Sequence, residues 1–342
     1  MSEEVLIEHA GRVGRIRLNR PKAIHALNTA MCRAILDALD EFEADEEVVA
    51  VLFDHAEGRG FCAGGDIRML AESGKGDGRE AREFFHAEYR MNHRLFTYSK
   101  PTIAFMDGIV MGGGVGIALP CTYRVATENT RFAMPETGIG LFPDVGGGWF
   151  LSRLPGQVGK FLALTGARLD GAECLALGLA THYISQDAVP EAKNAILDSV
   201  NFAEVLDRFS TESPPARILE NRDNIDRLFV GENVAAIMAA LEADGGDWAL
   251  KELATLRTKS PLSMTVSMRL LREGATMPDF AAEMTQEYAI GARVVHSHDF
   301  IEGVRALIVD KDNAPKWQPE VSDAEVDAIF APMLAGEEWT PL

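Results

Sequence analysis

Glycine-rich segments are the first residues in this sequence that could do chemistry. They span residues 58–66, 111–116 and 144–148, and the first two follow apolar runs typical of buried strands. Glycine allows positive φ angles and a close approach of a ligand to the backbone. A strand that ends in such a turn and opens a helix leaves free N–H groups, which can hold an anion or a developing oxyanion. One such segment is equally well explained as a tight turn, but two favour a site.

Two carboxylic acids lie beside the third glycine segment. Glu136 and Asp144 belong to residues 134–148, which contain too much Gly and Pro to form one helix. Carboxylates on a loop can meet at one cavity and serve there as nucleophile, base or acid. The alternative is structural: Glu136 would cap a helix or a loop, and Asp144 would be the N-cap of a helix that begins near Gly146.

The elements that must position these residues alternate between strands and helices. Residues 5–9 and 13–18 have the pattern of a short hairpin, and apolar residues at helical spacing follow Asn28, a good N-cap. Apolar, β-branched runs predict further strands at residues 48–53, 102–106, 123–126 and 131–134. Strands separated by helices predict an α/β fold with a largely parallel sheet.

Strand signals fade after about residue 186, where helical patterns take over. The clearest of these patterns predict helices at residues 262–271, 280–293 and 300–309. We therefore expect two regions: residues 1–185, which contain the sheet and the glycine segments, and residues 186–342, which are mainly helical.

Composition and charge exclude several classes of function. The net charge of −19, from 33 basic and 52 acidic residues, argues against nucleic-acid binding, which needs clustered Lys and Arg. No apolar run reaches the roughly 20 residues that span a bilayer, and no GxxxxGK[ST] or opening GxGxxG suggests a nucleotide. Neither the four Cys nor the His residues have metal-ligand spacing, so we expect reduced thiols and no metal site. The early acidic residues and the lack of a signal sequence predict a cytoplasmic protein.

Several segments, in their order and spacing, resemble the crotonase (enoyl-CoA hydratase/isomerase) superfamily. They are residues 19–23 (NRPKA), 26–28 (ALN), 61–66 (FCAGGD), 100–104 (KPTIA) and 111–114 (MGGG). The resemblance implies a spiral of ββα units, followed by a helical C-terminal region that often makes oligomer contacts, so a homo-oligomer is expected. It also implies an acyl-CoA substrate whose thioester oxygen lies between the amides of Gly65 and Gly113. Coenzyme A is then part of the substrate, and no separate cofactor is expected. The positions expected to bind coenzyme A are Lys22, Ala23, Ala63, Asp66 and Ile67.

The acids separate the branches of this superfamily. Hydratases usually carry a glutamate in the helix after the second glycine segment, and this sequence has Gly116 at that position. Residues 134–148, together with residues 161–166, 180–183 and 303–317, are similar to the 3-hydroxyisobutyryl-CoA hydrolase branch. That branch implies that Glu136 acts at the thioester and that Asp144 binds the substrate hydroxyl, positions water or helps to protonate the leaving thiolate. It also implies that Glu88 contacts the substrate, although Glu88 is equally well explained as a solvated helix residue.

The reaction that these residues predict is hydrolysis of a short, branched 3-hydroxyacyl-CoA. The expected substrate is 3-hydroxyisobutyryl-CoA, an intermediate of valine degradation. Glu136 either attacks the carbonyl to form an anhydride or activates a water molecule, and the sequence leaves both routes open. The alternatives are an enoyl-CoA hydratase or isomerase on the same fold, and a protein that binds a CoA ligand without catalysis.

Overall fold

The strands of the computed structural model, which describes residues 4–341, form two sheets. The larger sheet has the order β1-β2-β3-β5-β7-β9 and the smaller sheet the order β4-β6-β8. Every pairing is parallel except that of β1 with β2. The strands are β1(Val5–Ala10), β2(Val13–Leu18), β3(Ala50–His55), β4(Gly60–Cys62), β5(Thr102–Met106), β6(Ile109–Met111), β7(Tyr123–Ala126), β8(Arg131–Ala133) and β9(His182–Tyr183).

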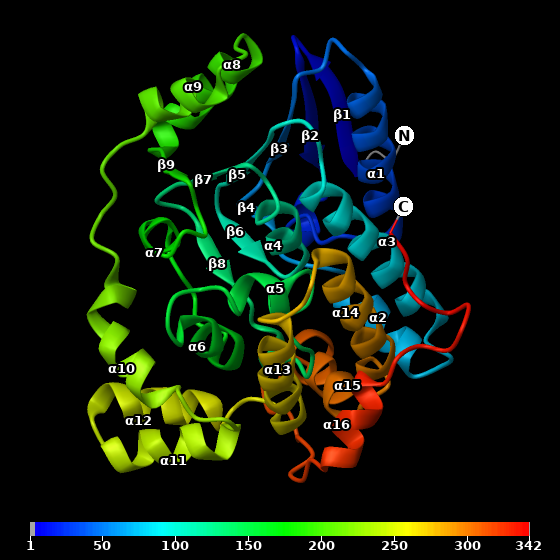
Figure 1. Ribbon diagram of the computed structural model, residues 1–342, viewed down its shortest axis with the longest axis vertical. Helices are drawn as coiled ribbons and strands as arrows, with labels where there is room; N and C mark the ends of the chain where they lie inside the picture. Colours follow the sequence, from blue (N-terminus) through cyan, green and yellow to red (C-terminus); the bar gives the residue numbers. More distant parts are fainter. Residues whose placement is uncertain (1–3, 342) are drawn as a thin grey trace.

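The helices follow the strands in a repeating order. Each of the pairs β3/β4, β5/β6 and β7/β8 sends its first strand to the large sheet and its second to the small sheet, and one or more helices come next (Figure 1). The helices are α1(Thr29–Ala44), α2(Ile67–Gly74), α3(Arg79–Phe96), α4(Gly113–Ala118), α5(Gly147–Leu151), α6(Val158–Thr165), α7(Gly171–Ala176), α8(Val189–Leu197), α9(Phe202–Phe209), α10(Arg222–Leu228), α11(Val234–Asp244), α12(Asp247–Leu256), α13(Pro261–Gly274), α14(Phe280–Val294), α15(His298–Val304) and α16(Asp323–Phe330). Short helical turns are η1(Pro21–Ala23), η2(Glu136–Gly138), η3(Gln186–Ala188), η4(Arg217–Asn221) and the π-helical turn η5(Arg305–Val309). The predicted spiral of ββα units is confirmed.

Local sequence patterns predicted the positions of most of these helices and strands correctly. The side chain of Asn28 accepts a hydrogen bond from the N–H of Met31 at 2.9 Å, as the predicted N-cap of α1 should. The strand predicted at residues 48–53 lies two residues later, as β3, and the helix predicted at 300–309 changes after Val304 from α-helix to the π-helical turn η5. A π-helical turn has no distinct apolar period, so the sequence pattern could not separate it from the helix before it.

The large sheet is buried on both faces. On one face, Leu52, Phe105 and Val125 pack in a cluster with residues of α8 and α9. The main core lies elsewhere, among α1, α3, the small sheet and the helices that follow β8. Parallel sheets of this kind need helices on both sides, which explains why the strands are nearly continuous apolar runs.

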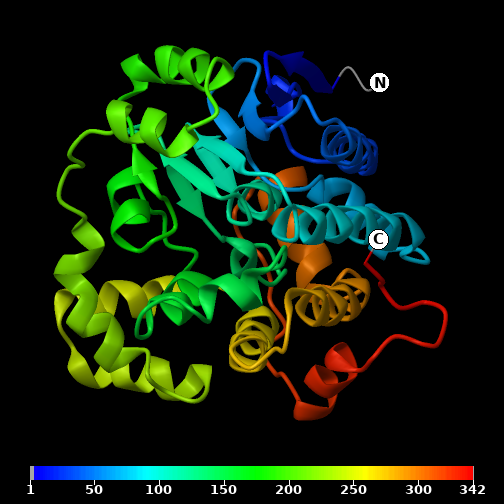
Figure 2. The ribbon, with the colours of Figure 1, turned by 45° about the horizontal axis from the view of Figure 1, so that its top comes forward.

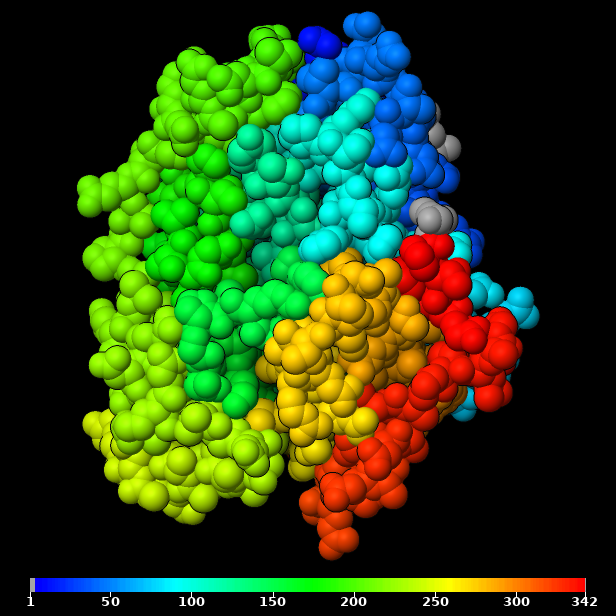
Figure 3. Space-filling model, in the orientation of Figure 1, coloured from blue at the N-terminus to red at the C-terminus, as the bar shows by residue number. Residues whose placement is uncertain are grey.

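The helices after β9 return to the strand-bearing part of the chain. Helix α13 packs on α5 and α6, and α14 lies alongside α3 (Figure 2). In Figure 3, residues after about 220 form most of the lower part of the visible face. Within residues 4–341, no helix is long and apolar enough to cross a membrane. The division of the chain at residue 185 stays a prediction.

Candidate active site

The small parallel sheet brings the predicted site residues together at one edge. The carboxyl ends of parallel strands meet on the same side, where open α/β sheets bind ligands. Here the register pairs Cys62 with Val110 and Met111 with Ala133, so the three strands end almost level. The first glycine segment follows β4, the second follows β6, and Glu136 comes three residues after the end of β8.

A cavity of about 210 Å³ lies at this edge. It contains both predicted oxyanion glycines and all three predicted acids, together with apolar side chains from α2, α3 and the C-terminal turn η5. Its lining residues are Ala63, Gly64, Gly65, Ile67, Leu70, Phe84, Phe85, Glu88, Met111, Gly112, Gly113, Pro135, Glu136, Ile139, Leu141, Asp144 and Ile308.

The backbone at Gly65 and Gly113 leaves two N–H groups available for a ligand. Gly113 is the first residue of α4, and neither its N–H nor that of Gly65 has an acceptor within the described part of the chain. A Cβ atom added to Gly113 would lie 2.4 Å from Oε1 of Glu88, and one added to Gly65 would lie 2.8 Å from Cζ of Phe84. A side chain at Gly113 or Gly65 would therefore have to displace Glu88 or Phe84.

Three carboxylic acids share this enclosed space. Glu88, Glu136 and Asp144 are 2%, 4% and 5% exposed, so all three are removed from bulk water. Oε1 of Glu88 and Oε2 of Glu136 have no hydrogen-bond partner among the described residues, whereas Oδ2 of Asp144 accepts a hydrogen bond of 2.8 Å from the hydroxyl of Tyr89. Polar atoms that are buried without a partner are uncommon in proteins, and here they point to a ligand.

Burial and mutual repulsion raise the pKa values of these acids. Burial, and then the negative charges of Asp144 and Glu136, raise the pKa of Glu88 well above its usual value. Burial and the charge of Asp144 do the same for the pKa of Glu136. Burial raises the pKa of Asp144 to about 6, although the hydrogen bond from Tyr89 opposes the rise. Ionisation of one group therefore makes ionisation of the other two less favourable, which favours retention of a proton among the three.

The structural explanations for these acids are wrong. The N-cap of α5 is Gly146, and the side chain of Asp144 accepts its hydrogen bond from Tyr89 and caps no helix. The side chain of Glu136 makes no cap at η2. Glu88 is buried on the inner face of α3, so it is not a solvated helix residue.

Gly116 leaves no room for the glutamate that hydratases carry at this position. A Cβ atom there would lie 2.6 Å from Nδ2 of Asn92 and 2.6 Å from Cβ of Val145. Asn92 is fully buried, and Val145 has a φ of 54°, a left-handed conformation that is rare for a β-branched residue. Neither neighbour can easily move, so the packing itself keeps a second acid out of this place.

We expect Gly116→Ala to lower the free energy of unfolding by about 1–3 kcal/mol, the usual effect of overpacking a core. Urea denaturation at fixed pH measures this change. Gly76→Ala is the control, because a Cβ atom at Gly76 meets nothing closer than an oxygen at 3.5 Å. Equal stabilities of the two variants would show that the core around Asn92 and Val145 adjusts easily.

The residues expected to bind coenzyme A fall into two groups. Ala63 and Ile67 line the cavity. Asp66, Lys22 and Ala23 do not: the side chain of Asp66 caps α2 and pairs with Arg20 at 3.0 Å, and the other two belong to the neighbouring turn η1. Backbone hydrogen bonds still join this region to the first glycine segment, including one of 2.9 Å from Ala63 N–H to the carbonyl of Ile24. Binding of coenzyme A here stays a prediction.

Sequence reasoning missed three residues that shape the cavity. Tyr89 orients Asp144 from a helix 55 positions earlier in the chain. Phe84 fills the space beside Gly65, and Ile308 reaches the cavity from the π-helical turn η5. The closeness of Tyr89 and Phe84 to Glu88 on one helix was the only available signal for those two residues. For Ile308, the signal was the similarity of residues 303–317 to the hydrolase branch, which does not place this side chain in the cavity.

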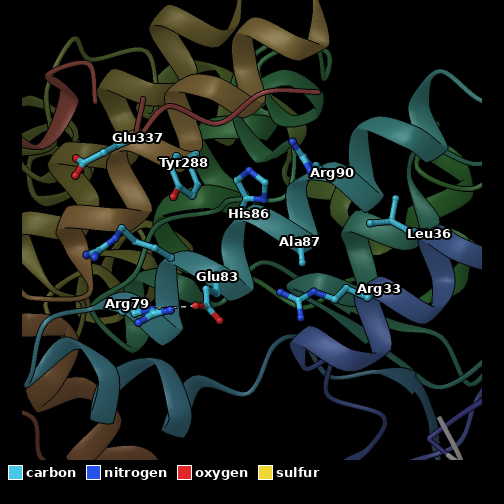
Figure 4. A pocket seen from close by; sticks show the side chains of 10 residues that line it. Arg33, Leu36, Arg79, Glu83, His86, Ala87, Arg90, Tyr288 and Glu337 are labelled. Atoms are coloured by element: carbon cyan, nitrogen blue, oxygen red, sulfur yellow. Dashed lines mark hydrogen bonds and ion pairs between the residues drawn. The ribbon is translucent and has the colours of Figure 1, made fainter. Parts of the chain in front are cut away.

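Two other cavities lie away from these residues. One of about 530 Å³ lies between α1 and α3, where residues such as Arg33, His86 and Arg90 line it (Figure 4). Its α3 residues are on the helix face opposite to Glu88, because they repeat at three- and four-residue intervals from Arg79. The other, of about 880 Å³, lies among α11, α13 and α16. No group of three or more His, Cys, Asp or Glu side chains in residues 4–341 is arranged to hold a metal ion.

A second set of buried acids lies behind the cavity, on α14. Glu283 and Glu287 are fully buried and one helical turn apart. Burial raises the pKa of Glu283 to about 7. Burial and the charges of Glu283 and Asp144 raise the pKa of Glu287 well above its usual value.

Replacement of Glu283 by Gln should change how stability depends on pH. The folded protein holds the proton of Glu283 more tightly than the unfolded chain, so the contribution of this group is lost as the pH rises from about 4.5 through 7. Gln has no proton to lose. The stability of Glu283→Gln relative to wild type should therefore increase between pH 5 and pH 8, by on the order of 1–3 kcal/mol. Denaturant unfolding at both pH values tests this, and a constant difference would contradict it.

Two known proteins that are similar in sequence carry the same name. The chain is 44% identical over 341 residues to the mitochondrial 3-hydroxyisobutyryl-CoA hydrolase of Xenopus tropicalis. The alignment covers 96% of this chain and 88% of the relative. It is 41% identical over 343 residues to the protein of the same name from Homo sapiens, with coverages of 96% and 89%.

Solved structures with the same fold carry other names. One described as a carnitinyl-CoA dehydratase from Mycobacterium thermoresistibile matches with a TM-score of 0.94 and 41% identity, over 99% of both chains. One described as an enoyl-CoA hydratase from Rhodobacter sphaeroides 2.4.1 matches with a TM-score of 0.91 and 38% identity, over 99% of this chain and 100% of that one. The sequence profile of the enoyl-CoA hydratase/isomerase family matches residues 13–330. With its paired glycine loops and its spiral of ββα units, the chain belongs to this family, within the crotonase superfamily.

Proposed function

We propose that this protein hydrolyses a short, branched 3-hydroxyacyl-CoA thioester, 3-hydroxyisobutyryl-CoA, to the free acid and coenzyme A, a step in valine degradation. One observation carries the proposal: Glu136 and Asp144 share a cavity with two free backbone amides, while the place of a second hydratase acid is closed at Gly116. The names of the sequence relatives from Xenopus tropicalis and Homo sapiens support it.

The amides of Gly65 and Gly113 are proposed to hold the thioester oxygen. Attack on the carbonyl places a negative charge on this oxygen, and two N–H donors fixed by the fold stabilise that charge without reorganising. Removing one such donor in comparable sites costs about 3–4 kcal/mol of transition-state stabilisation. Because the donors belong to the backbone, the two positions need only a small residue.

Glu136 is proposed to act at the carbonyl carbon. Its Oε2 atom is buried without a partner, so it is available to the substrate. As a nucleophile it would form an anhydride and release the thiolate, and water would then cleave the anhydride. As a base it would take a proton from a water molecule that attacks the carbonyl directly. In either route the thiolate receives a proton, and the acid that stays protonated among the three can supply it.

Asp144 and Glu88 are proposed to recognise the acyl group. A hydroxyl on carbon 3 of the substrate can donate a hydrogen bond to Asp144, whose other oxygen is already held by Tyr89. Glu88 borders the same space next to Gly113. The cavity of about 210 Å³ is bounded by Phe84, Phe85 and other apolar side chains, which suits a short branched acyl group.

Enoyl-CoA hydration is the second candidate, because the two structural relatives are named for hydratase and dehydratase reactions. A panel of acyl-CoA and enoyl-CoA thioesters separates the two functions when free thiol and enoyl absorbance are followed together. Release of thiol from 3-hydroxyisobutyryl-CoA, with no change in enoyl absorbance, is the expected result. A change in absorbance without thiol release would establish the second candidate, and binding without either would leave only a CoA-binding protein.

Four further expectations stay predictions. We propose that no cofactor is needed beyond the coenzyme A of the substrate, since no step above calls for one. A homo-oligomer is expected from the family resemblance, and a cytoplasmic location from the acidic N-terminal residues. The absence of nucleic-acid partners follows from the net charge of −19.

A further inference from the structure

A buried carboxylate on α14 holds the backbone that follows Asp144. Oε2 of Glu287 accepts a hydrogen bond of 2.9 Å from the N–H of Gly146, and its Oε1 accepts one of 3.3 Å from the N–H of Gly148. Glu287 is fully buried and lies about 140 positions away in the sequence. Glu287 therefore joins the helical C-terminal part of the chain to the loop that carries a proposed substrate-binding acid.

The backbone between Asp144 and this anchor is strained. Val145 has a φ of 54° and Gly146 a φ of 90°, both in the left-handed region. Such a conformation in a β-branched residue persists only where the surroundings determine it. Two features of the surroundings do so here: Val145 is packed against Gly116, and Glu287 holds the amides of Gly146 and Gly148.

The environment of Glu287 offers it no positive charge. The titratable groups that influence it are Glu283 on the same helix and Asp144 on the loop, and Tyr89 on α3 responds to its charge in turn. Arg153 interacts electrostatically with Glu283. A carboxylate that is buried among other acids destabilises a fold. The two hydrogen bonds from the turn offset part of that cost. Glutamine could not replace it, because glutamine has only one acceptor oxygen and its NH₂ group would face an N–H.

We propose that Glu287 is a positioning residue, which fixes Asp144 at the place where it meets the 3-hydroxyl of the substrate by holding the turn at Gly146 and Gly148. The inference rests on the proposed thioesterase function and names a residue that acts on substrate selection without touching the substrate.

Two substrates that differ only in the hydroxyl test this role. The ratio of kcat/KM for 3-hydroxyisobutyryl-CoA to that for isobutyryl-CoA reports the contact with Asp144, whereas partial unfolding lowers both values equally. Glu287→Gln should lower this ratio by about tenfold or more, since small displacements of a positioned group have effects of this size. Glu252→Gln is the control, because Glu252 is also buried but lies on α12, outside the cavity. It should keep the wild-type ratio.

Other results would contradict this role of Glu287, or would call for a second variant. A wild-type ratio in folded Glu287→Gln overturns the inference, and so does an equal loss in Glu252→Gln. If Glu287→Gln does not fold, Glu287→Asp keeps the charge with a shorter reach, and an unchanged ratio in it overturns the inference as well. Failure of the proposed function gives a different result, because wild type would then hydrolyse neither thioester, and the inference would fall with it.

Discussion

Glu136→Gln is expected to lower kcat for thioester hydrolysis by on the order of 10³- to 10⁴-fold, because Gln can neither attack the carbonyl nor accept a proton from water. The size and shape of the side chain are kept, so binding of the acyl-CoA should change little. Thiol release from 3-hydroxyisobutyryl-CoA under saturating substrate measures the effect, and isothermal titration with a non-hydrolysed thioether analogue measures the binding.

Glu252→Gln provides the control for this experiment. Burial also raises the pKa of Glu252, but this acid lies on α12, outside the cavity. It should retain wild-type kcat. Near-normal activity in Glu136→Gln would remove Glu136 from the mechanism, whereas an equal loss in both variants would show that any buried acid matters for folding alone.

Labelling of the wild-type enzyme during turnover tests for an anhydride that water cleaves on the Glu136 side. Repeated turnover in ¹⁸O-labelled water places the label in the Glu136 carboxylate if an anhydride forms and water cleaves it at the Glu136 carbonyl. A water molecule activated by Glu136 leaves the label in the product only. Mass spectrometry of the peptide that contains residue 136 distinguishes these results.

Asp144→Asn is expected to lower kcat/KM for 3-hydroxyisobutyryl-CoA by about 10²-fold. Asn keeps an oxygen for the hydroxyl of Tyr89, so the loop should stay in place, but it presents an NH₂ group where the substrate hydroxyl needs an acceptor. The loss for isobutyryl-CoA, which lacks the hydroxyl, should be much smaller. Similar losses for both substrates would mean that Asp144 acts at the thioester and not at the acyl group.

The pH dependence of this parameter gives a second measure. Burial raises the pKa of Asp144 to about 6, and the ionised form accepts a hydrogen bond from the substrate hydroxyl more strongly than the protonated form. Wild-type kcat/KM should therefore fall as the pH decreases below about 6, because this parameter reports the groups of the free enzyme. In Asp144→Asn, kcat/KM should not show this fall at low pH. Any fall of kcat/KM at low pH that remains in this variant is then due to protonation of Glu88 or Glu136.

The sequence was informative where function depends on local pattern. Glycine segments after buried strands predicted the two amides, and residues 134–148 predicted an acid pair on a loop. The structure was needed wherever a contact joins distant parts of the chain. Tyr89 meets Asp144 across 55 positions and Glu287 meets Gly146 across 141, and no period or spacing records such contacts. The structural alternatives for Glu88 and Asp144 were likewise excluded by burial and by the contact with Tyr89, which depend on the whole fold.

The crowding at Gly116 also limits how this protein could have diverged from its relatives. A hydratase acid at position 116 would first need space, and Asn92 and Val145 both occupy that space. A single substitution at 116 therefore passes through a destabilised intermediate, and a viable path would change Asn92 or Val145 beforehand. An acid at position 116 would thus depend on three positions together, none of which contacts coenzyme A in the proposed mechanism.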